Sequence, residues 1–145
     1  MFLAEANPLN GSALVFPVLE CIHIAGWATL VGTIALVDFR LLGFGLRKQT
    51  AAETAKDLGS WTLIGLALIL LSGPLLFSSD PDMYYLNSSF QFKMVCFVLA
   101  VIFNYTIHRK VVRAGPSRGV GAAVACVSIL LWMGVIFGGI FIAFV

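Results

Sequence analysis

The sequence GVGAAVACVSILLWMGVIFGGIFIAFV, residues 119–145, contains no charged side chain and decides the class of fold. A segment of about 20 apolar residues is long enough to cross the hydrocarbon core of a bilayer, which is about 30 Å thick. A second uncharged stretch covers residues 58–77. Because 60% of the 145 residues are hydrophobic and only 11% are charged, the chain has too little polar surface for a soluble globule. The composition therefore predicts a protein that crosses the membrane several times.

Four membrane-spanning helices are predicted, at about residues 13–44, 54–77, 89–113 and 120–145, within a single domain of residues 1–145. The connections between them are short, and short connections make neighbouring spans antiparallel. We therefore expect an all-α membrane protein whose four transmembrane helices form an up-down antiparallel bundle. Gly134 and Gly138 in the last span favour close helix packing, either within one chain or between two copies.

Positive charge predicts which side of the membrane each connection faces. The basic residues gather near the connections between the first and second spans and between the third and fourth: Arg40, Arg47, Lys48, Lys56, Arg109, Lys110, Arg113 and Arg118. The remaining connection, SSDPDMYYLNSS at residues 78–89, contains two aspartates and no basic residue. The positive-inside rule then places the two basic connections in the cytoplasm. Both termini and the 78–89 connection are predicted to lie outside.

His23 and His108 are the only histidines of the chain, and both lie in predicted spans. An ionisable side chain inside a bilayer is costly, so it indicates a functional site by default. Glu20 lies one turn before His23 on the same helix face, and Lys93 begins the third span at a similar depth. One expectation is a polar cluster of these three side chains near the outer surface. The alternative is that Lys93 extends to the headgroups while Glu20 faces water.

A second polar group is predicted at the cytoplasmic ends of the first and third spans. Asn104 lies one turn before His108 on the same helix face, and Asp38 and Arg40 lie near the end of the first span. We expect Asp38 to contact either His108 or Arg109. The alternative is that His108, which precedes two basic residues, is an ordinary residue of the membrane interface.

Residues 23–45, HIAGWATLVGTIALVDFRLLGFG, and residues 87–110, NSSFQFKMVCFVLAVIFNYTIHRK, together with Ser72-Gly73, resemble a family of small bacterial four-helix inner-membrane proteins. That family is distantly similar to the membrane domain of copper-resistance protein D. The resemblance implies a four-span bundle in the bacterial inner membrane, and it indicates the residues to test: His23, Asp38, Arg40, Lys93, Asn104 and His108. It implies no activity. Copper transport would come only from the distant relative, and the chain lacks the Met-rich or His-rich tracts that would suit it.

Three functions agree with these patterns. The first is an accessory subunit of a larger membrane complex without catalytic activity, because the loops are short and no Ser-His-Asp set, phosphate loop or zinc tetrad is present. The second is a redox subunit that binds haem b, with His23, His108 or both as ligands of the haem iron. The third is a transporter of a small solute or ion that uses Glu20, His23 and Lys93.

The haem hypothesis carries a geometric condition. By the rise of a helix, His23 and His108 lie roughly 15 Å or more apart along the membrane normal, so one chain is not expected to hold a single haem through both. A partner chain would have to supply the second axial ligand. The expected partners are membrane lipid and either other membrane subunits or further copies of the chain. Nucleic acid is not expected, because the short basic connections are explained by topology.

Overall fold

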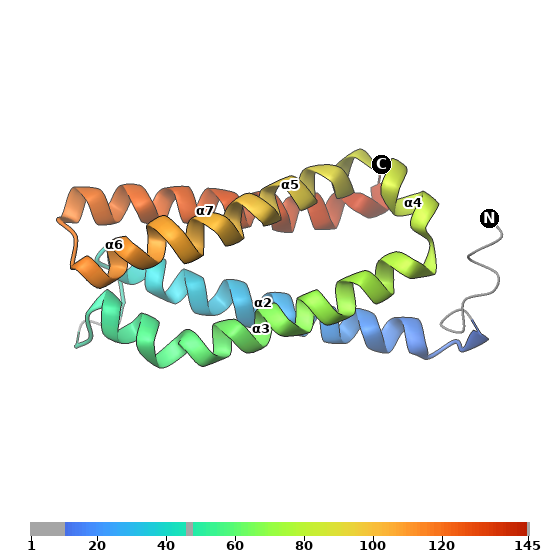
Figure 1. Cartoon of the computed structure of the whole chain (residues 1–145), viewed down its shortest axis with the longest axis horizontal. Coiled ribbons are helices and arrows are strands. Elements are labelled where there is room, and N and C mark those ends of the chain that lie inside the picture. Colours follow the sequence, from blue (N-terminus) through green and yellow to red (C-terminus); the bar gives the residue numbers. More distant parts are fainter. Residues whose placement is uncertain (1–10, 46–47, 145) are drawn as a thin grey trace.

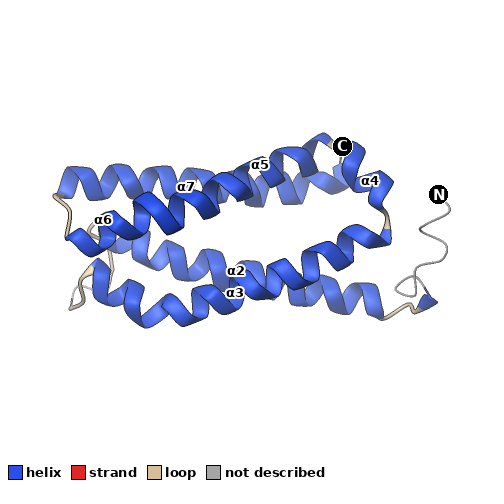
Figure 2. Cartoon of the chain, viewed as in Figure 1, coloured by secondary structure: helices blue, strands red, loops and turns tan. Residues whose placement is uncertain are grey.

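The computed structural model describes residues 11–45 and 48–144, and these residues form helices and short loops (Figure 2). Within them, four helical segments are long and apolar enough to cross a membrane: Val15–Leu41, Ala51–Ser79, Ser88–Ala114 and Arg118–Phe144. The segments run up and down in turn and form a bundle (Figure 1). The predicted all-α bundle of four spans is confirmed, and the chain is a multi-pass membrane protein. Arg47 of the first basic connection lies outside the described residues.

The first hairpin consists of α2 (Val15–Leu41) and α3 (Ala51–Ser79). Helix α3 begins at Ala51 rather than near residue 54, because Thr50 and Glu53 form a capping box. The Glu53 N–H donates to Thr50 Oγ1 at 3.2 Å, and the Thr50 N–H donates to Glu53 Oε2 at 2.7 Å. These two bonds satisfy backbone donors that a helix start would otherwise leave without partners.

The connection at residues 78–89 contains a short helix, α4 (Pro81–Leu86), rather than only a loop. The Asp80 carboxylate accepts the Met83 N–H at 3.2 Å, and Pro81 occupies the first turn, where its missing N–H costs nothing. Asn87 then begins the next helix by accepting the Phe90 N–H at 3.0 Å. Local capping therefore makes this polar connection helical at one end of the bundle (Figure 1).

The third span is divided into α5 (Ser88–Phe103), a π-helical turn η2 (Asn104–His108) and α6 (Arg109–Ala114). The π-helical turn was not predicted from the sequence. Such turns are rare and occur frequently at functional sites. After α6, Gly115 adopts a φ of +63°, which glycine tolerates without strain, and the chain turns into α7 (Arg118–Phe141) and η3 (Ile142–Phe144).

Glycines set how closely the helices approach within each of the two hairpins, α2 with α3 and α5 with α7. A Cβ atom at Gly65 of α3 would lie 2.6 Å from the Leu30 nitrogen of α2, which no packing arrangement permits. A Cβ atom at Gly138 of α7 would lie 3.1 Å from Lys93 Cα of α5. In the described residues, Gly138 thus takes part in packing within one chain.

An aromatic cluster lies at the centre of the bundle, where α2, α5 and α7 meet. The Trp27 ring centroid lies 5.4 Å from that of Phe97 and 6.2 Å from that of Trp132, and all three pairs are edge-to-face. Edge-to-face packing of this kind adds to the stability gained from burial alone. We call these three rings the aromatic core.

The two ends of the bundle differ in composition. The end that holds α4, with Tyr84 and Tyr85, is here named the tyrosine end. The opposite end holds α6 and the start of α7, with Arg109, Arg113 and Arg118, and is named the basic end. The aromatic core lies between them, so side chains at the two ends form separate sites.

Candidate functional site

A cavity of about 1080 Å³ lies at the tyrosine end, bounded by α2, α3, α4, α5, α7 and η3. All three members of the expected polar cluster line it: Glu20, His23 and Lys93. The rings of Phe77, Tyr84 and Phe90 also line it and pack on one another, with centroids 5.5 to 6.1 Å apart. The cavity therefore combines charged, neutral polar and aromatic walls.

His23 is held by hydrogen bonds at both ring nitrogens. Its Nδ1 lies 2.8 Å from Ser72 Oγ, and Trp27 Nε1–H donates to its Nε2 at 2.9 Å. The Ser72 hydroxyl proton is directed to the Leu68 carbonyl oxygen, so the Ser72 oxygen accepts from His23 Nδ1–H. Because Nε2 accepts a hydrogen bond, the ring is the neutral Nδ1–H tautomer. A haem iron bound through Nε2 would displace Trp27.

Lys93 contacts the aromatic core rather than a carboxylate. Its ammonium nitrogen lies 5.4 Å from the Trp27 ring centroid, within the range of a cation–π interaction. A Cβ atom at Gly139 would lie 3.5 Å from the same nitrogen, so the side chain lies along α7. No carboxylate of the described residues lies within ion-pair distance of Lys93. The structure therefore brings Lys93 close to His23 through Trp27, but it does not pair Lys93 with Glu20.

Glu20 lies on the α4 side of the cavity. Its side chain is exposed and takes part in no hydrogen bond or ion pair among the described residues. Burial raises the pKa of Tyr84, and the carboxylates of Glu20 and Asp80 raise it further. Tyr84 therefore remains an uncharged hydroxyl close to Glu20.

At the basic end, Asp38 is a buried carboxylate with 1% of its surface exposed. His108 Nε2 lies 2.7 Å from Asp38 Oδ1, and Ser128 Oγ–H donates to Asp38 Oδ2 at 2.7 Å. Of the two contacts expected for Asp38, the described residues form the one with His108 and not the one with Arg109. Because Ser128 donates to the carboxylate and not to the imidazole, the three side chains do not have the order of a nucleophilic triad. They join α2, η2 and α7.

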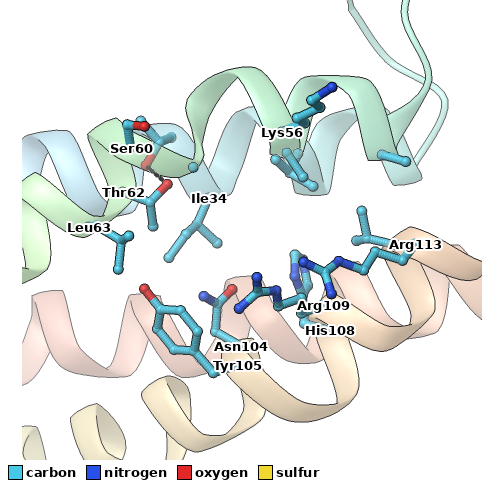
Figure 3. A pocket seen from close by; sticks show the side chains of 16 residues that line it. Ile34, Lys56, Ser60, Thr62, Leu63, Asn104, Tyr105, His108, Arg109 and Arg113 are labelled. Carbon is cyan, nitrogen blue, oxygen red and sulfur yellow. Dashed lines mark hydrogen bonds between the residues drawn. The ribbon is translucent and has the colours of Figure 1, made fainter.

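The side chains of the two remaining predicted residues form no hydrogen bond with this group within the described residues. Arg40 Nε–H donates to the backbone carbonyl of Gln49 and holds the connection between α2 and α3 in place. Asn104 lines a second cavity, of about 650 Å³, which lies between α3 and the η2–α6 segment and is also bounded by α2 (Figure 3). His108 lines the same cavity. A cavity next to a histidine therefore lies at each end of the bundle.

Three hydrogen-bond partners were not predicted: Trp27, Ser72 and Ser128. Ser128 is the only hydroxyl side chain in residues 119–145, and a lone polar group in a span is a signal that it bonds to another helix. Trp27 follows His23 by one helical turn, so contact between the two was predictable. The contact of Ser72 with His23 was less predictable, because a serine in a span can instead bond to the backbone of its own helix, as Ser72 also does to the Leu68 carbonyl.

The described residues were compared with the side-chain groupings that bind metal ions. Among residues 11–45 and 48–144, no three His, Cys, Asp or Glu side chains gather in a way that would hold a metal ion. At His108 a haem iron bound through Nε2 would displace the Asp38 carboxylate, as it would displace Trp27 at His23. Both histidines thus have protein partners at the nitrogen through which axial ligation usually occurs.

Comparison with known proteins identifies the family to which this four-span fold belongs. No match to the chain was found among curated proteins or among solved structures. A family model matches residues 11–145, which include all four spans and both cavities. The chain therefore belongs to the family described as "Family of unknown function (DUF6644)".

Proposed function

We propose that this protein is a membrane transporter that binds a small zwitterionic solute in the tyrosine-end cavity. One observation carries the proposal: two opposite charges, Glu20 and Lys93, line a single cavity and do not pair with each other. An ammonium group without an anionic partner is costly inside a membrane and indicates a ligand. A solute that carries both a carboxylate and an ammonium group would satisfy both side chains at once.

The carboxylate of the solute binds at Lys93 in this proposal. Among the described residues that line the cavity, Lys93 is the one cation, because His23 is neutral. Trp27 holds the ammonium of Lys93 by its ring face, and the hydrogen bond to His23 fixes that ring. His23 and Ser72 therefore act as positioning residues for Lys93 rather than as ligands.

The ammonium group of the solute lies toward Glu20 and the rings beside it. Aromatic faces attract cations, so the rings of Tyr84 and Phe90 add to the attraction of the carboxylate. A cavity of about 1080 Å³ is as large as typical sites for small ligands, which span roughly 300–1,000 Å³. Solutes the size of a simple amino acid or a betaine fit this volume.

Transport requires a path from this cavity to the other side of the membrane. The aromatic core separates the two cavities, and Trp27 belongs both to that core and to the surroundings of Lys93. We propose that binding at Lys93 moves Trp27 and so opens the core. The positive-inside rule supports an orientation with the basic end in the cytoplasm of a bacterium, so that the tyrosine-end cavity opens to the outside.

The proposal is tested with the purified chain in liposomes. Radiolabelled alanine, leucine and glycine betaine are the zwitterionic probes, and acetate and choline carry only one charge each. We expect uptake of at least one zwitterion above that of protein-free liposomes. Lys93→Gln and Glu20→Gln should each lower it by about tenfold or more, since each removes a charged partner. Lys93→Arg should retain uptake, and so should Lys110→Gln, which removes an exposed cation outside both cavities.

Two results would contradict the proposal. One is the absence of uptake for all three zwitterions, and the other is uptake that neither Lys93→Gln nor Glu20→Gln changes. If acetate is taken up and its uptake increases in Glu20→Gln, the transported solute is an anion and not a zwitterion.

The accessory-subunit role and haem b binding stay predictions from the sequence. A reduced-minus-oxidised visible spectrum of the purified protein, together with the haem content per chain, tests haem b binding directly.

A further inference from the structure

The cavity at the basic end has features of a second binding site. Its volume is about 650 Å³, and it shares no lining residue with the tyrosine-end cavity. One wall is the π-helical turn η2, an unusual backbone that is frequently found at functional sites. Figure 3 shows the opposite wall, formed by α3 with Ser60, Thr62 and Leu63.

Two polar side chains of η2 face this cavity without partners. The Tyr105 hydroxyl is buried and has no hydrogen bond within the described residues. Asn104 is only 9% exposed, and its side-chain amide makes no hydrogen bond in that part of the chain either. Figure 3 shows both side chains pointing into the space toward α3. Because buried polar groups nearly always have partners, the buried Tyr105 hydroxyl indicates a ligand that supplies the missing bond, and the Asn104 amide beside it can bond to the same ligand.

The two threonine hydroxyls of the same cavity are already satisfied. Thr62 Oγ1 lies 2.9 Å from Thr33 Oγ1, and both hydroxyls also bond to backbone carbonyls of their own helices. The nearby Asp38 carboxylate is bonded on both oxygens. Among the polar side chains of this cavity that are not exposed, Asn104 and Tyr105 therefore lack partners within the described residues, which gives the ligand a defined position at η2.

Two arginines give the cavity a positive charge. Figure 3 shows the side chains of Arg109 and Arg113 in the gap between α3 and α6, with Arg113 extending back toward Arg109, whereas the Lys56 ammonium points away. Within the described residues neither arginine forms an ion pair. Guanidinium groups bind phosphate oxygens through two parallel hydrogen bonds each, so two such groups at one cavity favour a phosphate.

Apolar side chains complete the walls, among them Ile34, Val37 and Val112. Leu63 lines the cavity and is also 56% exposed on the outside of the bundle, so the cavity adjoins the surface that faces the acyl chains. A ligand that fits has an anionic phosphate, further polar atoms and an apolar tail. Basic pockets between spans at the cytoplasmic side are known to bind the headgroups of anionic lipids.

We propose that the basic-end cavity binds the phosphodiester headgroup of an anionic phospholipid. The phosphate lies between Arg109 and Arg113, and hydroxyl groups of the headgroup bond to the Asn104 amide and the Tyr105 hydroxyl. The acyl chains extend out of the cavity past Leu63 and lie along α3. A soluble phosphate ester offers the same head chemistry without the tail, and the test separates the two sources.

The test is native mass spectrometry of the full chain in detergent, with dioleoylphosphatidylglycerol and dioleoylphosphatidylcholine as competing probes. We expect one phosphatidylglycerol to remain bound per chain and phosphatidylcholine to be displaced. The double variant Arg109→Gln/Arg113→Gln should weaken phosphatidylglycerol binding by about tenfold or more, and Tyr105→Phe, which removes only the hydroxyl, by about fivefold. Arg118→Gln is the matched control, because Arg118 is an exposed arginine at the same end that does not line the cavity. It should bind as the unaltered chain does.

Each alternative outcome overturns the proposal in a different way. Equal retention of phosphatidylcholine would mean that the headgroup is not recognised. An equal loss in Arg118→Gln would mean that general surface charge attracts the lipid and that the cavity has no part in it. Binding of glycerol 1-phosphate with equal affinity would assign the site to a soluble phosphate ester. The conservative variant Arg109→Lys/Arg113→Lys keeps the charge, so retained binding there, together with loss in the Gln variants, excludes a simple failure to fold.

Discussion

Replacing His108 by alanine should weaken the folded state strongly, because it removes one of the two donors that bond the buried Asp38 carboxylate. The Asp38 side chain is 1% exposed and that of His108 is 6% exposed, so water does not readily replace the lost donor. Leaving a buried carboxylate without one partner of a buried pair costs about 3–5 kcal/mol. We expect the free energy of unfolding to fall by about that amount in His108→Ala.

Ser128→Ala should cost less than His108→Ala, because it removes a single hydrogen bond and leaves the other donor in place. A hydrogen bond to a charged group contributes about 1.5–3 kcal/mol, which sets the expected loss. Asp38→Asn removes the charge but keeps an oxygen that accepts from His108. If Asp38→Asn lowers the free energy of unfolding by less than His108→Ala does, most of the destabilisation in His108→Ala comes from the unpaired carboxylate.

The assay is unfolding by sodium dodecyl sulfate in mixed micelles, followed by tryptophan fluorescence. Trp132 is buried in the aromatic core and reports the loss of packing. Ser60→Ala is the control, because Ser60 is exposed and forms no hydrogen bond within the described residues, and it should change the free energy of unfolding by less than about 0.5 kcal/mol. A loss below about 1 kcal/mol in His108→Ala would refute the reasoning, since the carboxylate would then be tolerated without this donor.

Two further predictions concern helix packing and helix capping. Gly65→Ala should lower the free energy of unfolding by about 1–3 kcal/mol or more, because the new Cβ would lie 2.6 Å from the Leu30 nitrogen. The control is Gly59→Ala in the same helix, where the new Cβ meets nothing within 4 Å. This control should raise the free energy of unfolding by up to about 1 kcal/mol. The same unfolding assay compares the two, and equal effects would contradict the close approach of α2 and α3. Thr50→Ala should cost about 0.5–2 kcal/mol and speed hydrogen exchange in the first turn of α3, while Thr50→Ser should keep the capping box. Unchanged exchange of the Glu53 amide in Thr50→Ala would show that the cap does not hold this turn.

The four spans were predictable because burial of apolar surface in a bilayer dominates all local preferences, as the uncharged stretches 58–77 and 119–145 illustrate. The ends of the helices were less predictable from hydropathy alone. Thr50 with Glu53, and Asp80 with Pro81, are polar signals that lie within polar connections, where the apolar pattern gives no information. Capping motifs read separately would have placed the start of α3 and the existence of α4.

The contact between Asp38 and His108 could be predicted from depth, since both lie near the same end of antiparallel spans. Their third partner, Ser128, could not be assigned with the same argument. Depth depends only on the position along a helix, whereas a contact also depends on how each helix is rotated about its own axis. Spans that are apolar on all sides carry little information about rotation, because no face is distinctly polar. The π-helical turn η2 gave no signal in the sequence either.

The two histidines illustrate how one residue type takes different roles within one fold. His23 bonds only to neutral groups, and its ring orients Trp27 beside Lys93, so its effect is on the tyrosine-end cavity. His108 bonds to a buried carboxylate and joins three helical segments, so its effect is on the stability of the basic end. Replacing His23 is therefore expected to lower the proposed zwitterion uptake more than the stability, and replacing His108 is expected to lower the stability more than the uptake. Because the aromatic core separates the two, each effect stays at its own end of the bundle unless Trp27 itself moves.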